Sequence, residues 1–322
     1  MSELSRMVCT FCLLLAACGG EGGNGGSANG GGVAVVTVPT PPPTTAPPAS
    51  YPLAMDLSRD REMFGQGVEL TAMFRYVPGK PRDIPPESVS SSIITGRYRT
   101  VFTFRAADTA AWLNYDGEVS NYTASDLIVP RFKNDLAWSR ESNDERAADF
   151  FVIAQPNLDE SYVAASRQLI YQAEGFDVPL TQNIHRYFLF GSRTLSEDLS
   201  RAGGSTYRAF LATTSFSLSE KGFYGKADEV SVDHAAGTIT SSIVVTEGNL
   251  VEGLAPMSTT LTLTGGYGSN GFIGRITSAG GRYGGSFAGD LFGPNGQELG
   301  LVIMITRTDG SRMIGLLTAR RG

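Results

Sequence analysis

The second half of the chain alternates apolar and polar residues with a period of two. Leu261 and Leu263 alternate with threonines, and Phe287 and Leu291 fall on one face of their segment with Asp290 on the other. This alternation is typical of β-strands that have one face in a core and the other in water. We therefore expect strands here, with residues such as Asp290 on the wet face.

Eight such runs follow residue 205, each bounded by Gly, Asn, Asp or Pro. We expect strands at residues 207–217, 225–233, 238–246, 258–264, 271–278, 284–291, 298–306 and 312–319. Linking sequences such as Pro294-Asn295-Gly296 supply the positive φ angles that hairpin turns require. Evenly spaced strands without an intervening helical pattern predict an all-β, eight-stranded, antiparallel up-and-down barrel.

The last two predicted strands are apolar on both faces, because Leu301 and Ile303 alternate with Val302 and Met304. Such strands are usually buried on both sides. We expect this wall of the barrel to pack against the first half of the chain. Outward threonines, Arg275 and Asp290 argue against a barrel whose outer face meets lipid.

The first half shows a mixed pattern. It predicts strands at residues 67–76, 91–104, 150–154 and 162–173, and helical turns at residues 106–112 and 140–149. The charged run at residues 140–146 is typical of a solvated face. These features predict an N-terminal β-rich domain at residues 51–200, followed by the barrel domain at residues 201–322.

The first 50 residues predict export and attachment. Residues 7–17 form a short apolar stretch, and residues 15–19 (LAACG) resemble the bacterial lipobox. The resemblance implies a signal peptide at residues 1–17 and a Cys18 that carries diacylglycerol and palmitate. Gly19 favours the outer membrane as destination. An ordinary secretory leader remains the alternative.

Residues 18–50 are rich in Gly and Ser and then in Pro and Thr, so they predict a tether between lipid and folded body. All three cysteines lie within the first 18 residues, so we expect neither a disulfide nor a thiolate metal site in the folded part. The net charge is -6, and no basic face is visible. Nucleic acid is therefore not an expected partner.

Residues 283–300, which read YGGSFAGDLFGPNGQELG, resemble a hallmark of the transferrin-binding protein B family. In that family a Gly-x-Phe-x-Gly strand leads into an aromatic-Gly-Pro turn and then a Glu-x-Gly strand. Residues 190–194, 203–207, 233–238 and 314–319 are also similar to family segments. The resemblance covers about residues 185–322, and it makes residues 51–200 a counterpart of the family's handle domain.

The resemblance implies a non-enzymatic lipoprotein, anchored in the outer membrane and exposed at the cell surface. Its ligand would be a host or environmental protein, or a haem- or iron-bearing molecule. The resemblance also implies an outer-membrane transporter and a surface-translocation factor as partners. Two alternatives stay open: a structural or protective envelope lipoprotein without a nutrient ligand, and a hydrolase of unknown type.

Motifs for catalysis, metals and cofactors were sought along the chain, and none predicts a site. His185 and His234 are the only histidines, and neither has a metal-ligand spacing to a second ligand. Residues 266–271 fit Gly-x-Gly-x-x-Gly, but they lead into a strand where a dinucleotide motif needs a helix. We expect a hairpin loop there, no cofactor, and structural roles for both histidines.

Overall fold

The computed structural model describes residues 51–75, 85–96, 99–128, 136–141, 147–154, 161–174, 180–199, 203–218, 221–249, 257–268 and 271–322. Its regular elements are β-strands and two short 3-10 turns, η2 (Ala124–Asp126) and η3 (Pro294–Gly296). The all-β prediction is confirmed. Residues 1–50, with Cys18, lie outside the described part, so lipid attachment stays a prediction. Across the described ranges, no helix has the length and apolar character to cross a bilayer.

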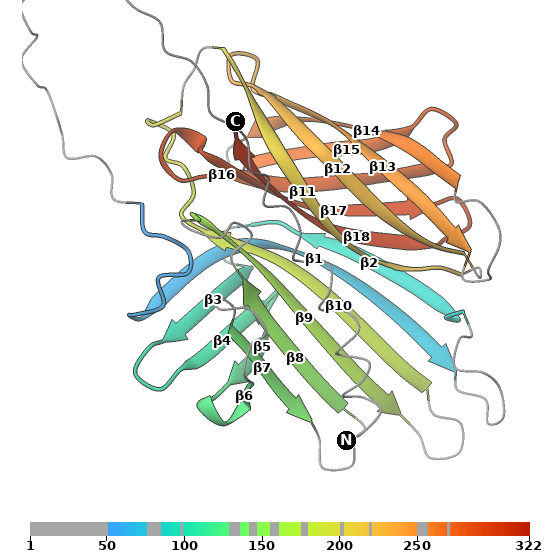
Figure 1. Cartoon of the computed structure of the whole chain (residues 1–322). Coiled ribbons are helices and arrows are strands. Elements are labelled where there is room, and N and C mark those ends of the chain that lie inside the picture. Colours follow the sequence, from blue (N-terminus) through green and yellow to red (C-terminus); the bar gives the residue numbers. More distant parts are fainter. Residues whose placement is uncertain are drawn as a thin grey trace, which may run out of the picture. The chain divides into compact units, whose positions relative to one another are not determined.

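Eight strands that follow one another along the chain close into an antiparallel barrel, coloured yellow to red in Figure 1. They are β11 (Gly204–Phe216), β12 (Lys221–Asp233), β13 (Thr238–Asn249), β14 (Met257–Gly268), β15 (Gly271–Ser278), β16 (Tyr283–Phe292), β17 (Glu298–Arg307) and β18 (Arg312–Arg321). Each overlaps one predicted run. Because β18 pairs with β11, the ladder has no free edge. The eight-stranded up-and-down barrel is confirmed.

Apolar side chains fill the inside of the barrel. Tyr207, Phe223, Phe272, Phe287 and Leu301 belong to one continuous buried cluster with the other inward-facing residues. An eight-stranded barrel is only wide enough for side chains to fill. The barrel is therefore a packed core.

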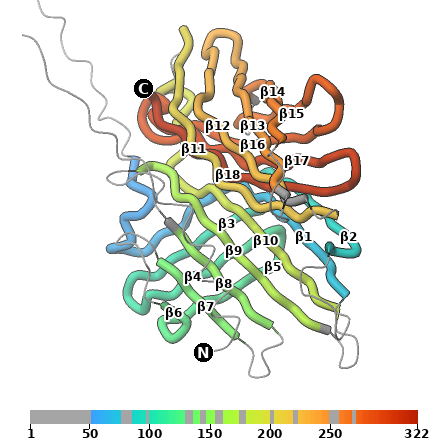
Figure 2. The backbone as a smooth tube through the Cα atoms, turned by 45° about the vertical axis from the view of Figure 1, so that its right-hand side comes forward, coloured from blue at the N-terminus to red at the C-terminus, as the bar shows by residue number. Residues whose placement is uncertain are grey.

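The residues before the barrel form a second sheet, with strand order β5-β4-β3-β1-β10-β9-β8-β7-β6 and β2 beside β1. Its strands are β1 (Arg61–Arg75), β2 (Ser88–Ile94), β3 (Thr100–Arg105), β4 (Ala110–Tyr115), β5 (Glu118–Tyr122), β6 (Leu127–Ile128), β7 (Leu136–Glu141), β8 (Ala147–Ala154), β9 (Val163–Glu174) and β10 (Leu180–Gly191). Strand β1 pairs with β3 through its first part and with β2 through its later part. Both views show β1 and β10 side by side (Figures 1 and 2).

This sheet curls so that its first edge strand meets its far strands through side chains. The ring of Tyr122 on β5 stacks on Phe151 of β8 with 5.3 Å between centroids, and lies 6.0 Å from the ring of Trp138 on β7. Phe102 and Phe188 complete the buried cluster inside the curl. Aromatic packing therefore closes the curl where backbone pairing does not.

Beside this aromatic core, the curl encloses a buried polar network. Arg186 donates Nε to Glu69 (2.7 Å) and Nη2 to Glu118 (2.6 Å), and Nη1 to Gln168 (3.2 Å). Gln168 in turn donates Nε2 to the Tyr122 hydroxyl at 3.0 Å. These bonds join the central strands β1, β9 and β10 to the edge strand β5, and they satisfy polar groups that burial would otherwise penalise.

The helical turn predicted at residues 106–112 is wrong. Residues 106–109 form a turn, and β4 begins at Ala110. Pairing with β3 and β5 sends Leu113 into the core and Trp112 outward, so tertiary pairing overrides a weak local signal. The single strand predicted at residues 91–104 is two strands, β2 and β3, because Gly96 turns the chain between them with φ of 123°.

The helical turn predicted at residues 140–149 is also wrong wherever the structure describes it. Arg140 and Glu141 end β7, Ala147 begins β8, and residues 142–146 lie outside the described part. Arg140 stands opposite Asp149 in the ladder and pairs with it at 2.5 Å, so it is not a freely solvated charge. Strands β4, β5, β6, β7 and β10 are absent from the predicted set.

Candidate functional site: the joint and the mouth of the barrel

The barrel contacts the curled sheet through an apolar wall. Val302 of β17 and Ile314 and Leu316 of β18 share one buried cluster with Val68 and Leu70 of β1. These are the outward side chains of strands that the sequence predicts to be apolar on both faces. The prediction that this wall packs against the first half is confirmed. We call this contact, with the polar groups described next, the joint.

Glu298 is the most deeply buried carboxylate of the joint, with 1% of its surface exposed. Its Oε2 accepts hydrogen bonds from the Ser161 hydroxyl (2.9 Å) and from the backbone N–H groups of Tyr162 (2.7 Å) and Val163 (3.1 Å). These donors stand at the start of β9, whereas Glu298 begins β17. One barrel carboxylate thus holds the sheet at three points.

Asp290 makes a second polar contact across the joint. It accepts a hydrogen bond from Nε2 of Gln66 on β1 (2.8 Å) and is ion-paired with Arg193, which follows β10. A cavity of about 10 Å3, room for one water, lies beside these groups. The prediction that Asp290 lies on a wet face is wrong: it is 4% exposed, because the sheet covers the outer face of β16 near its end, at Ala288 and Phe292.

Two glycines of the segment at residues 283–300 allow the close approach at the joint. Gly293 has φ of 74°, and a Cβ there would come within 2.3 Å of the Tyr162 ring. A Cβ on Gly300 would come within 2.9 Å of the Leu189 side chain. Asp290, Glu298 and these two glycines all belong to the segment at residues 283–300. This segment therefore supplies much of the barrel surface that contacts the sheet.

We expect Asp290 to make stability depend on pH. Burial raises the pKa of Asp290 from 3.8 to about 6, with Arg193 opposing the shift. Because the folded-state pKa lies above the unfolded value, its contribution is largest below pH 4 and disappears as pH rises through 6. In urea titrations, the unfolding free energy of the wild type minus that of Asp290→Asn should be about 2 kcal/mol more positive at pH 4.5 than at pH 7.5. A difference that does not vary with pH would contradict this.

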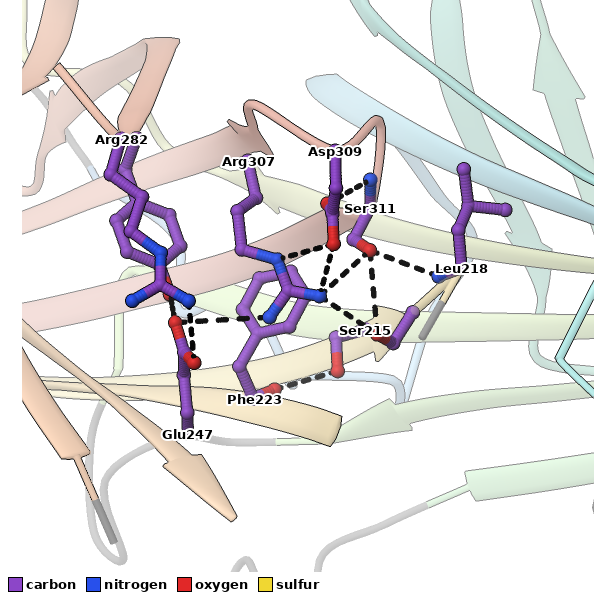
Figure 3. Close-up of polar contacts among 10 residues, drawn as sticks. Ser215, Leu218, Phe223, Glu247, Arg282, Arg307, Asp309 and Ser311 are labelled. Atoms are coloured by element: carbon purple, nitrogen blue, oxygen red, sulfur yellow. Dashed lines mark hydrogen bonds and ion pairs between the residues drawn. The ribbon is translucent and has the colours of Figure 1, made fainter. Parts of the chain in front are cut away.

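A charged network closes the opposite end of the barrel, which we call the mouth (Figure 3). Glu247 at the end of β13 is buried and pairs with Arg282 (2.9 Å) and Arg307 (3.7 Å). It also accepts a hydrogen bond from the Tyr283 hydroxyl. Burial, and then this contact, raise the pKa of Tyr283 to about 12, so it remains a donor at physiological pH.

Arg307 carries the network to the turn between β17 and β18. Its guanidinium pairs with Asp309 (2.5 Å) and donates to the hydroxyl of Ser311 (3.0 Å), as drawn in Figure 3. It also donates to the hydroxyl of Ser217 (3.1 Å). Hydrogen bonds from Arg307 lower the pKa of Asp309 to about 2. With Glu247, Asp309 balances the two arginines, so these four side chains together carry no net charge.

Exposed apolar side chains flank this neutral network. Tyr224 and Met257 are each 56% exposed, on β12 and β14 next to Glu247 on β13. The mouth lies at the start of β16. Tyr51, the first described residue, lies near the other end of this strand, because its hydroxyl accepts a hydrogen bond from Leu195, and the preceding residue, Thr194, bonds to Leu291 of β16. Since β16 is 10 residues long, roughly 30 Å separate the two ends.

The two histidines lie on β10 and in the turn after β12. His185 is buried at the joint, with Nδ1 3.2 Å from Arg167 and its ring against Phe216. Burial lowers the pKa of His185 and of His234, whose Nε2 lies 2.8 Å from the Ser205 hydroxyl. Within the described residues, no three or more His, Cys, Asp or Glu side chains group closely enough to hold a metal.

Sequence reasoning identified the apolar wall of the joint, but it did not identify the polar contacts of the joint or the residues of the mouth. One signal points to the joint: Asp290 and Glu298 flank or lie within strands that are otherwise apolar, and carboxylates are seldom buried unless paired. The mouth residues carry no local signal. Glu247 and Arg307 are 60 residues apart in sequence and meet only when the barrel closes.

No family model matches the chain, and no curated protein matches it. Among solved structures, a double mutant of the vaccine antigen transferrin-binding protein B from Haemophilus parasuis is 15% identical, with 80% of this chain and 45% of that chain covered and a TM-score of 0.41. Transferrin-binding protein B from serogroup B Neisseria meningitidis is 15% identical, with 79% and 43% covered and a TM-score of 0.38. The chain thus spans less than half the length of either protein.

Proposed function

We propose that this chain is a lipid-anchored binding protein of the outer membrane that holds a protein, or a haem- or iron-bearing ligand, at the cell surface. One observation carries the proposal: the barrel mouth exposes Tyr224 and Met257 at the end remote from Tyr51. Residue 51 follows the predicted tether, so the mouth would face away from the membrane. Aromatic and Met side chains are enriched in protein interfaces.

The filled barrel supports recognition on the outside of the protein. A carrier barrel keeps an interior cavity for its ligand, whereas here large side chains such as Phe287 occupy that space. The joint supports the same function, because a rigid body holds its exposed loops in fixed positions. In this proposal residues 51–200 and 201–322 are the two domains, and Cys18 carries the lipid.

A binding assay tests the ligand. We expect the full-length chain carrying Cys18→Ala to bind one of human transferrin, haemoglobin or haemin saturably on a biosensor. The double variant Tyr224→Ala/Met257→Ala should bind at least about tenfold more weakly, as removal of anchor side chains does at other interfaces. Thr240→Ala, an exposed residue of β13 near the end of the barrel remote from the mouth, serves as the matched control. If none of the three ligands binds, a structural envelope lipoprotein becomes the better reading.

Protease shaving of intact cells tests whether the protein is anchored at the cell surface. The wild type should lose its barrel epitope on shaving, and Cys18→Ala should be released from the membrane fraction. Both results together would support a surface lipoprotein, for which an outer-membrane transporter and a translocation factor would be the expected partners. Full protection of the wild type, with unchanged fractionation of the variant, would contradict the surface anchor.

A further inference from the structure

The two tryptophans of the chain lie in opposite environments. Trp138 is fully buried inside the curl of the sheet. Trp112 on β4 is only half-buried and points out of the opposite face, because Ala111 and Leu113 on either side of it point into the core. Tryptophan is highly buried on average, so an outward indole on a sheet face indicates a surface that binds something.

Trp112 stands in a row of four side chains that crosses four strands. In the ladder, Glu62 of β1 is opposite Thr103 of β3, Thr103 is opposite Trp112, and Trp112 is opposite Asn121 of β5. Residues directly opposite in antiparallel strands point to the same face, about 5 Å apart. The row therefore places a carboxylate, a hydroxyl, an indole and an amide side by side, over the strands labelled β1, β3, β4 and β5 in Figure 1.

The polar groups of this row have no partner among the residues that the structure describes. No hydrogen bond or ion pair within the described ranges involves the side chains of Glu62, Thr103 or Asn121, or the indole N–H of Trp112. The neighbouring Arg61 does have partners: it pairs with the Asp56 carboxylate at 3.1 Å and donates hydrogen bonds to the backbone carbonyls of Asp56 and Leu53. Among the residues that the structure describes, the row thus offers donors and acceptors that no protein group satisfies, next to an aromatic ring.

An open hollow of about 390 Å3 lies over Glu62, Thr103 and Trp112 of the row, within the size range of small-ligand sites. Its lining includes Asp60, Glu62, Thr103, Arg105 and Trp112. The Arg105 guanidinium lies 5.0 Å from the Trp112 ring centre. Its ion pair with Asp108 is 3.5 Å long and both groups are about half exposed, so Arg105 can move aside and donate to a ligand.

We propose that this row is a binding site for a neutral carbohydrate chain. A sugar ring has an apolar C–H face that packs on an indole and hydroxyls at its edge that pair with carboxylates, amides and hydroxyls. Glu62, Asp60 and Asp108 outnumber Arg61 and Arg105, which disfavours an anionic ligand. The site lies on the outer face of the curled sheet, away from the mouth, so it does not depend on the protein-capture function.

Calorimetric titration of the full-length chain carrying Cys18→Ala tests the site. The probes are maltotriose, cellotriose, triacetylchitotriose and, as an anionic comparison, sialyllactose. We expect saturable binding of at least one neutral trisaccharide and loss of binding in Trp112→Ala. Glu62→Gln and Asn121→Ala should each weaken binding about fivefold or more, as loss of one hydrogen-bond partner does. Trp112→Phe, which keeps an aromatic face, should retain part of the affinity.

Thr262→Ala, on the exposed wall of the barrel, is the matched control and should bind like the parent chain. The unfolding midpoint of each variant checks that the sheet remains folded. The proposal is overturned if no neutral trisaccharide binds, if only sialyllactose binds, or if binding survives in a folded Trp112→Ala variant. None of these results bears on the ligand at the mouth, so the two proposals can fail separately.

Discussion

Replacing Glu298 with Ala should destabilise the protein by roughly 3–5 kcal/mol, because three donors lose their shared buried acceptor. The Ser161 hydroxyl can still donate to the Val163 carbonyl at 2.8 Å, whereas the N–H groups of Tyr162 and Val163 lose the carboxylate oxygen. Urea unfolding followed by circular dichroism measures the change. Stability should fall because water has little access to a residue that is 1% exposed, so it does not replace the lost acceptor.

Two further variants identify the cause. Glu298→Gln keeps an acceptor oxygen but loses the charge, so we expect a loss between those of the wild type and Glu298→Ala. Glu229→Ala removes an exposed carboxylate of the same barrel and should change stability by less than about 0.5 kcal/mol. If Glu298→Ala were no more harmful than Glu229→Ala, the proposed role of Glu298 in the joint would be wrong.

The barrel could be predicted from sequence because each of its strands carries its own signal. Alternation places Leu261 and Leu263 inside, and turn residues such as Gly237 and Gly310, both with positive φ, end the strands. These are local properties, and the eight runs follow one another without insertion. The closed barrel then follows from the need to remove free edges.

Strand β10 escaped prediction for the opposite reason. Residues 187–190 are buried without a break, because Phe188 and Phe190 face the core of the curl while Tyr187 and Leu189 face the barrel. A short, continuous apolar run does not distinguish strand from helix. Strand β5 is short and polar and is held at the edge by Tyr122, so its place depends on contacts far away in sequence.

The same limit explains the sites. Asp290 has the alternation of a wet residue, and only the sheet, more than 200 residues away at Gln66, makes it buried. Trp112 is the opposite case, an aromatic residue that lies on the outer face. Its neighbours Ala111 and Leu113 are core residues, and the pairing of Trp112 with Asn121 fixes the face on which its side chain lies. The alternation of residues along a strand therefore shows that the strand has two faces. Contacts with distant strands determine which of these faces is buried.

The barrel on its own should be poorly soluble, because separation from the sheet uncovers the wall that holds Val302, Ile314 and Leu316. Exposing each of these side chains costs about 1.5–3 kcal/mol of burial. It also leaves the Glu298 carboxylate without its three donors. We expect a fragment of residues 203–322 to aggregate or to bind a hydrophobic dye at concentrations where the whole chain stays monomeric.

A paired substitution separates this cause from general misfolding. Val302→Thr with Ile314→Thr makes the wall polar, so it should improve the solubility of the fragment while it lowers the stability of the whole chain. Light scattering and urea unfolding measure the two effects. A fragment as soluble and stable as the whole chain would show that the barrel is independent of the sheet. The double variant raises the solubility of the fragment and lowers the stability of the whole chain only if the sheet covers this wall.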